Sequence, residues 1–152
     1  MNSDLFFMKK AYEQALLGFN KEEIPVGAVV VYKDEIISEA HNESIRKVDP
    51  TSHAEVEAIR KASLKLGNYR LTNARIYVTL EPCLMCCGAM IHARLDKVIF
   101  SSIDKKSGAV VSNGNLLEAK FTNHLVKFEQ GPLQQESSDL LKEFFKTRRT
   151  KV

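Results

Sequence analysis

Two short segments of the chain carry side chains that could bind one metal ion together. His53-Ala54-Glu55 supplies an imidazole, and Pro82-Cys83-Leu84-Met85-Cys86 supplies two thiols. Imidazole and thiolate are ligands that zinc prefers, and cysteines three residues apart on a helix face one point. A structural zinc is normally closed by four protein ligands, whereas a catalytic zinc keeps a position for water. The three ligands His53, Cys83 and Cys86 therefore predict a catalytic zinc.

Glu55 is the candidate for proton transfer beside such a metal. Zinc lowers the pKa of its bound water from about 15.7 towards 7, so a nearby carboxylate could take a proton from that water and deliver it to a substrate. Transfer of this kind contributes roughly 10²–10⁴ in rate. Residues two apart on an ideal helix are separated by about 200°. His53 and Glu55 therefore share a pocket only if the helix begins at or just after His53.

Each motif is less specific when it stands alone. A Cys-x-x-Cys pair also occurs in redox sites and in structural zinc sites, and a His-x-Glu pair by itself indicates almost nothing. Cys87 could supply another thiol, but it points elsewhere on the helix than its neighbour Cys86, and we expect it in the core. Together, in this order and with Pro82 before the first cysteine, the two motifs resemble the signature of zinc-dependent nucleobase deaminases.

Length and composition bound the class of protein. The 152 residues predict a single domain over 1–152, with a hydrophobic fraction of 44% and a charged fraction of 27% that are ordinary for globular proteins. The net charge of +3 is compatible with a polyanionic partner. No stretch reaches the ~20 apolar residues of a membrane span, and charges interrupt the N-terminus, so we expect no membrane contact. Three clustered cysteines make a poor disulfide framework, which predicts the cytoplasm.

The apolar pattern predicts helices and strands in alternation. Strands are expected at 26–32, 36–40, 76–80, 98–101 and 125–128, the first two forming a hairpin about Lys33-Asp34. Helices are expected near the N-terminus, after the turn at 49–51 as far as Gly67, from Pro82 to about Arg94, at 116–119 and after 131–132. The first helix should bury Leu5, Met8, Tyr12, Ala15, Leu16 and Phe19, and the last should bury Leu133, Leu140, Leu141, Phe144 and Phe145.

This order of elements predicts an α/β sandwich with a mixed sheet, because a hairpin precedes the crossover units. The metal cluster should then lie at the carboxyl edge of the sheet, where the sites of α/β proteins usually lie.

Nearly the whole chain resembles the bacterial tRNA-specific adenosine deaminases of the cytidine and deoxycytidylate deaminase superfamily. The zinc motif is common to that superfamily, including its cytosine and guanine deaminases, so the flanking segments carry the closer resemblance. These segments are 23–28, 41–42, 49–55, 68–71, 77–83, 88–92, 104–108, 123–124 and 144–149. The resemblance implies a cytidine-deaminase-like three-layer α/β/α sandwich with a mixed five-stranded sheet, one zinc ion per subunit, and a homodimer.

The resemblance also implies a reaction, in which zinc-activated water deaminates adenosine to inosine at the wobble position (34) of tRNA, bound through its anticodon stem-loop. Glu55 would protonate N1 of the ring, and Asn42 would hydrogen-bond the flipped-out base. The other positions that the resemblance places at the substrate are Ile24, Pro25, Val26, Ala54, Asp104, Phe145, Arg148 and Arg149. Taken alone, residues 24–26 also fit strand core, Asn42 a turn-capping amide, and the two arginines a solvated helix end.

The chain departs from the family pattern at Cys87, at Ser101-Ser102 and over residues 110–115. The last two departures lie near the expected anticodon-loop surface and keep an alternative open, a deaminase of a free base or nucleoside of the guanine or cytosine type. A non-enzymatic zinc module is the third hypothesis. It would show a fourth protein ligand, such as Cys87 or His92, closing the metal site.

Overall fold

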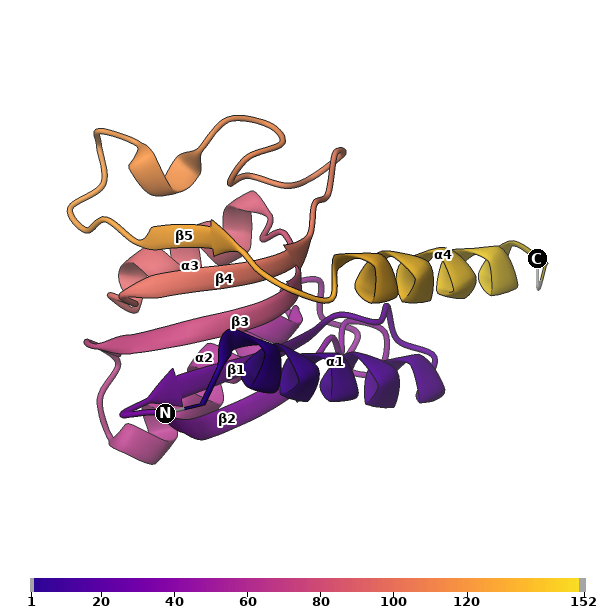
Figure 1. Ribbon diagram of the computed structural model, residues 1–152, viewed down its shortest axis with the longest axis horizontal. Coiled ribbons are helices and arrows are strands. Elements are labelled where there is room, and N and C mark those ends of the chain that lie inside the picture. The colour runs from indigo at the N-terminus through magenta and orange to yellow at the C-terminus, as the bar shows by residue number, and fades with distance from the viewer. Residues whose placement is uncertain (1, 151–152) are drawn as a thin grey trace.

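The computed structural model describes residues 2–150, the last two of them as backbone only. Figure 1 shows the elements in chain order: α1 (Asp4–Asn20), β1 (Gly27–Tyr32), β2 (Glu35–His41), α2 (Ala54–Leu66), β3 (Ala74–Leu80), α3 (Leu84–His92), β4 (Lys97–Ser102), the short 3₁₀ helix η1 (Leu116–Glu118), β5 (Lys127–Gln130) and α4 (Gln134–Thr150). None of the helices within 2–150 has both the length and the apolar character needed to cross a lipid bilayer.

The five strands form one mixed sheet, as predicted, and its strand order is β2-β1-β3-β4-β5. Strand β1 is antiparallel to β2 and β3, whereas β3, β4 and β5 run parallel. The β1–β2 hairpin turns at Lys33 and Asp34, whose φ angles of 52° and 63° are the left-handed values that a tight hairpin turn needs. Helix α3 provides the crossover that joins the parallel strands β3 and β4.

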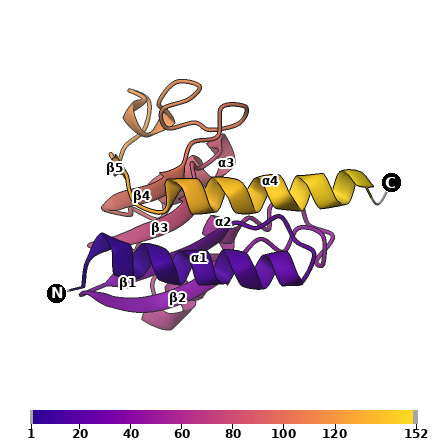
Figure 2. The same cartoon turned by 45° about the vertical axis from the view of Figure 1, so that its right-hand side comes forward.

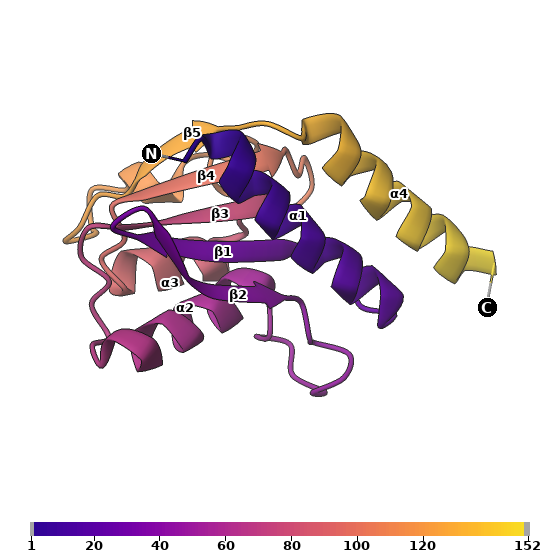
Figure 3. The same ribbon diagram turned by 60° about the horizontal axis from the view of Figure 1, so that its bottom comes forward.

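Helices cover both faces of the sheet, which confirms the three-layer α/β/α sandwich. Helices α1 and α4 lie side by side on one face, and α2 and α3 lie on the other (Figures 2 and 3). The alternation along β1 matches this arrangement: Ala28 and Val30 join the core beneath α2 and α3, and Val29 and Val31 join the core beneath α1. Both faces of the central strands are therefore apolar.

Helix α1 is present as predicted, but two of the six residues expected on its buried face, Leu5 and Leu16, are exposed. The residues that it buries are Phe7, Met8, Ala11, Ala15 and Gly18. Leu5 and Leu16 remain 43% and 38% exposed. The reason is a close backbone approach, because a Cβ on Gly27 would lie 1.9 Å from the carbonyl oxygen of Ala11. Such contact requires small residues where α1 passes Gly27, namely Ala11 and Ala15, and the larger leucines turn outward.

Most strand boundaries differ from the prediction by one or two residues, as do those of the third helix, and two of the differences have a clear structural cause. The last strand begins at Lys127 instead of residue 125, because β5 is an edge strand whose register is set by pairing with β4. The third helix begins after Cys83, its N-cap, and ends at His92. It ends short of Arg94 because that residue has a φ of 60°, which an α-helix does not accommodate.

Candidate active site

The topology gathers four strand ends at one edge of the sheet. Strands β3 and β4 end there, and the antiparallel hairpin brings the start of β1 and the end of β2 to the same edge. Together with the first turn of α2 and part of α4, these segments surround a cavity of about 550 Å³. Its lining residues are Ile24, Val26, Asn42, His53, Glu55, Leu80, Glu81, Cys83, Ile103, Asp104, Lys105, Lys106, Ser107, Leu141 and Phe145.

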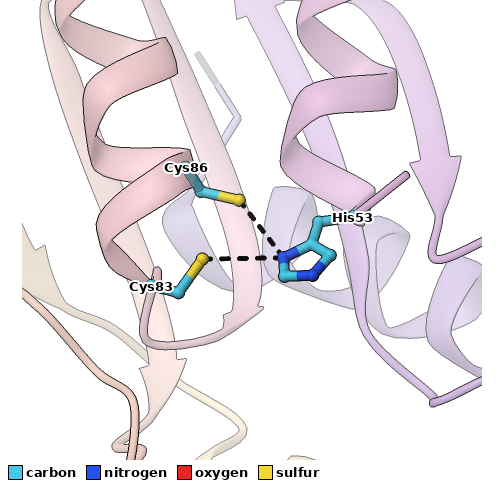
Figure 4. A group of neighbouring side chains, drawn as sticks. All are labelled: His53, Cys83 and Cys86. Atoms are coloured by element: carbon cyan, nitrogen blue, oxygen red, sulfur yellow. Dashed lines mark hydrogen bonds between the residues drawn. The ribbon is translucent and has the colours of Figure 1, made fainter. Parts of the chain in front are cut away.

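The three predicted metal ligands converge on one point (Figure 4), and two of them, His53 and Cys83, line this cavity. The Nδ1 atom of His53 lies 3.6 Å from Sγ of Cys83 and 3.5 Å from Sγ of Cys86. All three donor atoms lie within 4.8 Å of one another. A tetrahedral zinc with Zn–S of about 2.3 Å and Zn–N of about 2.0 Å places nitrogen and sulfur about 3.5 Å apart. The residues present therefore fit zinc.

The electrostatics of the two thiols favour a cation. A hydrogen bond from the Cys86 thiol, supported by His53, lowers the pKa of Cys83 to about 4. The same hydrogen bond and burial raise the pKa of Cys86. The pair therefore holds one proton, which a bound metal displaces when both sulfurs become thiolates.

Both ligand segments are helix starts, which explains how short motifs position them. His53 is the N-cap of α2 and has an extended backbone (φ −75°, ψ 154°), and Cys83 is the N-cap of α3 (φ −77°, ψ 176°). Asn42 fixes the first of these starts, because its Oδ1 accepts the Ala54 backbone N–H at 2.7 Å. Cys86 then follows Cys83 by about one turn of α3 and reaches the same point.

Glu55 lies in the first turn of α2 and lines the cavity together with His53. The condition stated from the sequence is met, since His53 is an extended N-cap and the separation of side chains along an ideal helix does not apply to it. Glu55 is only 4% exposed, and burial raises its pKa to about 7. A carboxyl group with this pKa can accept and release a proton near neutral pH.

The other predicted substrate positions divide into two groups. Ile24, Val26, Asn42, Asp104 and Phe145 line the cavity. Pro25 and Ala54 are buried and do not line it, and Ala54 packs in the core beneath α2. Asn42 combines both interpretations made from the sequence, because it caps α2 through its carbonyl oxygen and also borders the cavity.

The C-terminal residues lie further from the metal ligands. Phe144 is buried, whereas its neighbour Phe145 is 46% exposed. Arg148 stacks over the Phe144 ring at 5.4 Å and borders a separate small cavity with Phe19, between the ends of α1 and α4. The side chain of Arg149 lies outside the described residues.

Several cavity residues escaped the sequence analysis. They are Leu80, Glu81, Ile103, Lys105, Lys106, Ser107 and Leu141. Two signals pointed to some of them: a basic pair follows Asp104 directly, and a carboxylate precedes Pro82. Most residues of this set reach the cavity only because the fold brings the loops after β3 and β4 together.

The metal site has three protein ligands and no fourth among residues 2–150. Cys87 is buried in the core, as expected, and His92 is exposed at the far end of α3. The feature that would mark a closed, non-enzymatic zinc module is therefore missing from the described part of the chain. The fold and the site define a zinc-dependent enzyme that activates water beside a buried carboxylate.

Comparison with known proteins identifies the family. Residues 1–102 match the family described as the cytidine and deoxycytidylate deaminase zinc-binding region. The chain belongs to this family of zinc-dependent deaminases. It is 48% identical over 147 residues to the tRNA-specific adenosine deaminase of Aquifex aeolicus, covering 97% of each chain.

Solved structures agree with this assignment. The chain is similar to a structure from studies of A-to-I editing by tRNA:A34 deaminases at the wobble position of transfer RNA, with a TM-score of 0.87 and 34% identity over 90% of this chain and 99% of the other. It is also similar to the guanine deaminase of Bacillus subtilis, with a TM-score of 0.66 and 32% identity over 98% and 95% of the two chains.

Proposed function

We propose that this protein hydrolyses the 6-amino group of adenosine at position 34 of tRNA, producing inosine and ammonia. The relative from Aquifex aeolicus and the structure with the TM-score of 0.87 both support a tRNA substrate. The observation that carries the proposal is the composition of the cavity. The metal ligands His53 and Cys83 and the buried carboxylate of Glu55 line it, together with the exposed Lys105 and Lys106. In a tRNA substrate, the base would meet the metal and the carboxylate, and the neighbouring phosphates would meet the lysines.

His53, Cys83 and Cys86 would hold zinc, which would supply a polarised water molecule with a pKa lowered towards neutrality. Glu55 takes a proton from that water and delivers it to N1 of the adenine ring. As the water oxygen bonds to C6, Glu55 would pass the second proton of the water to the 6-amino group, the C6–N bond would break, and ammonia would leave. A carboxyl group with a pKa raised to about 7 is suited to both transfers.

Asn42 and the apolar wall orient the base. The Asn42 Oδ1 is occupied by the Ala54 N–H, so the side chain presents its NH₂ group as a donor to the ring. Ile24 and Val26 supply the apolar surface against the purine. Phe145, which is half exposed at the same cavity, offers a stacking surface for a neighbouring anticodon base.

The experiment compares tRNA with small substrates. Purified zinc-loaded protein is incubated with an arginine tRNA that carries A34, with the same tRNA carrying G34, and with free adenosine, guanine, cytosine and cytidine. We expect inosine at position 34 of the first tRNA only. Release of ammonia from guanine or cytosine, without inosine in the tRNA, would instead establish the alternative of a free-base deaminase.

The assembly and location proposed are a homodimer in the cytoplasm. A largely apolar groove between α2 and α3 supports the dimer, lined by Val56, Ile59, Leu64, Tyr69 and Ala89 among others. Leu64 and Tyr69 are highly exposed there, as is common where a second subunit packs. We expect Leu64→Glu to convert a dimer into a monomer in sedimentation. Reduced thiols at the metal site fit the cytoplasm, where tRNA also occurs.

A further inference from the structure

Glu81 lies directly before the Pro82-Cys83 zinc-ligand segment and is 2% exposed. Its carboxylate is surrounded by donors from one loop, residues 103–112. The Oε1 atom accepts the N–H of Asp104 at 3.0 Å and the hydroxyl of Ser112 at 2.5 Å. The Oε2 atom accepts the N–H groups of Val110, Val111 and Ser112 at 3.0, 2.8 and 3.0 Å.

These five hydrogen bonds exceed the roughly four acceptor positions of a carboxylate. Glu81 therefore has no acceptor left for a substrate, although it borders the cavity. Its contacts instead hold the two ends of the 103–112 loop together. Gly108 shows how closely the loop passes, because a Cβ at that position would lie 2.2 Å from Cδ of Glu81.

The segment between these anchored ends carries Lys105 and Lys106 at the cavity. Asp104 Oδ1 accepts the N–H of Lys106 at 3.2 Å, and Asn113 Nδ2 donates to the carbonyl of Lys105 at 3.0 Å. The backbone of both lysines is therefore fixed. Both side chains are exposed, and neither forms an ion pair within the described part of the chain.

We propose that Glu81 is a positioning residue that organises the 103–112 loop so that Lys105 and Lys106 contact phosphates beside the target nucleotide. The inference rests on the proposed function and deepens it, since it assigns the polyanion contact to this loop. Glu81 acts through the lysines and not through the metal or the base. Replacing its carboxylate by an amide places an NH₂ group against backbone N–H donors and releases the loop.

Kinetics on A34 tRNA test the role. We expect Glu81→Gln to raise the KM for tRNA about tenfold or more while kcat changes little, and Ser112→Ala, which removes one of the five bonds, to raise it roughly threefold. Each variant should keep one zinc per chain. Ser112→Ala also keeps the test open if Glu81→Gln folds poorly. An unchanged KM in both variants would overturn the proposal.

A salt series and a combined variant separate positioning from a general structural role. Loss of the lysine contacts should lower the slope of log KM against log salt by about one per contact, both in Lys105→Ala/Lys106→Ala and in Glu81→Gln. Adding Glu81→Gln to the double lysine variant should raise KM less than about twofold further. An undiminished effect of Glu81→Gln without the lysines would refute the proposal. Lys65→Ala, at the opposite end of α2 from His53, is the matched control and should leave the slope unchanged.

Hydrogen exchange tests the anchoring without any substrate. The amides of residues 110–112 should exchange about a hundredfold faster in Glu81→Gln than in the wild type. Equal exchange would refute the anchoring even if tRNA proved not to be the substrate. Failure of the wild type to deaminate tRNA counts against the proposed function, whereas wild-type turnover with an unaffected Glu81→Gln variant counts against this inference alone.

Discussion

Three buried glutamates show how environment decides the role of a residue. Glu23 accepts the backbone N–H groups of Ile45 and Arg46, and Glu81 accepts those of the 103–112 loop. Both carboxylates serve as anchors for loops that border the active-site edge of the sheet. Glu55 instead adjoins the zinc ligands, and burial raises its pKa to about 7. The same type of side chain therefore supports backbone at two positions, and at the third we propose that it transfers protons.

Glu55→Ala tests the proton-transfer role. We expect kcat to fall by roughly 10²–10⁴ or more, because no other group described at the metal site can shuttle the protons. Zinc content should stay at one ion per chain, since Glu55 is not part of the ligand set. His53→Ala is the complementary control and should lose the metal. Turnover of Glu55→Ala at the wild-type rate would disprove the assignment, and metal analysis of the same preparations completes the test.

At the scale of elements, close contact between α1 and β1 sets the position of the site. Gly27 begins β1, directly after the wall residues Ile24 and Val26, and its N–H donates to Oγ1 of Thr79 in β3. The backbone of α1 passes over Gly27 too closely for any side chain. The depth at which α1 packs thus determines where the apolar wall of the cavity lies.

Gly27→Ala should destabilise the protein by about 3 kcal/mol, because the added Cβ would lie 1.9 Å from the Ala11 oxygen and must push α1 away. Urea unfolding monitored by circular dichroism measures the change. Gly88→Ala is the matched control, since a Cβ there meets no atom within 4 Å and the residue lies inside α3. We expect that variant to be more stable by about 0.5–1 kcal/mol. Equal stability of Gly27→Ala and the wild type would show that the contact is not tight.

The Tyr77 side chain links β3 to the start of α1 through hydrogen bonds. We expect its ionisation to reduce the stability of the protein at alkaline pH. Its hydroxyl donates to Asp4 at 2.5 Å and accepts from Nε of Arg75 at 3.0 Å. Burial, more than any other cause, raises the pKa of Tyr77 to about 12. The pKa of Tyr77 in the folded protein exceeds the unfolded value of about 10. The contribution of the protonated hydroxyl to folding stability is therefore complete below pH 10 and is lost as the pH rises towards 12.

Tyr77→Phe should therefore be less stable than the wild type by about 1 kcal/mol at pH 8. Between pH 10 and 12 the wild type should lose about 2 kcal/mol of stability as Tyr77 ionises, whereas the variant has no group that titrates at this position. The variant should therefore become the more stable protein near pH 12. Urea unfolding across this range measures the difference. Tyr69→Phe, at an exposed position, should follow the wild-type profile. A deficit that does not change with pH would show that Tyr77 keeps an ordinary pKa.

Local patterns predicted most elements and the zinc ligands, whereas long-range contacts decided the rest. The valine-rich run of β1 and the Gly67 helix end are local signals, and both elements lie where expected. The buried face of α1 depends on contact with Gly27, which lies outside the helix, at the start of β1. The apolar pattern within α1 does not contain that information. The register of β5 depended on β4. The role of Glu81 depended on amides some thirty residues away, whose side chains carry no sign of it.

This last point also explains a departure from the family pattern. Residues 110–115 differ from the usual family sequence, yet Val110, Val111 and Ser112 contact Glu81 through backbone N–H groups. Four of the five donors to Glu81 are backbone N–H groups, which do not depend on side-chain identity, so the loop can vary in sequence at positions other than Ser112 and keep most of its anchor.

At the scale of the whole molecule, the long α4 extends the active-site face beyond the sheet (Figure 3). Phe145 borders the active-site cavity, and Arg148 lies about one turn further along the helix. The stacking of Arg148 on buried Phe144 holds its guanidinium near the end of α1. A tRNA that places one base in the cavity would extend its backbone over this surface.

Arg148→Ala should weaken tRNA binding and lower the slope of log affinity against log salt by about 1, as expected for one lost phosphate contact. Filter binding over a salt series measures both quantities. Lys142→Ala is the matched control, because that lysine is exposed on the same helix but points to another side. Zinc content should be unaffected in both variants. Wild-type binding by Arg148→Ala would indicate that its stacking on Phe144 only stabilises the helix end.

The zinc ligands come from two different helices, and 30 residues separate His53 from Cys83. An ion held by all three side chains cross-links α2 to α3 and closes that length of chain into a ring, which disfavours the unfolded state. In a cell that lacks zinc, the enzyme would therefore lose its activity. Its folded state would also be less stable, and the unfolded chain would be degraded.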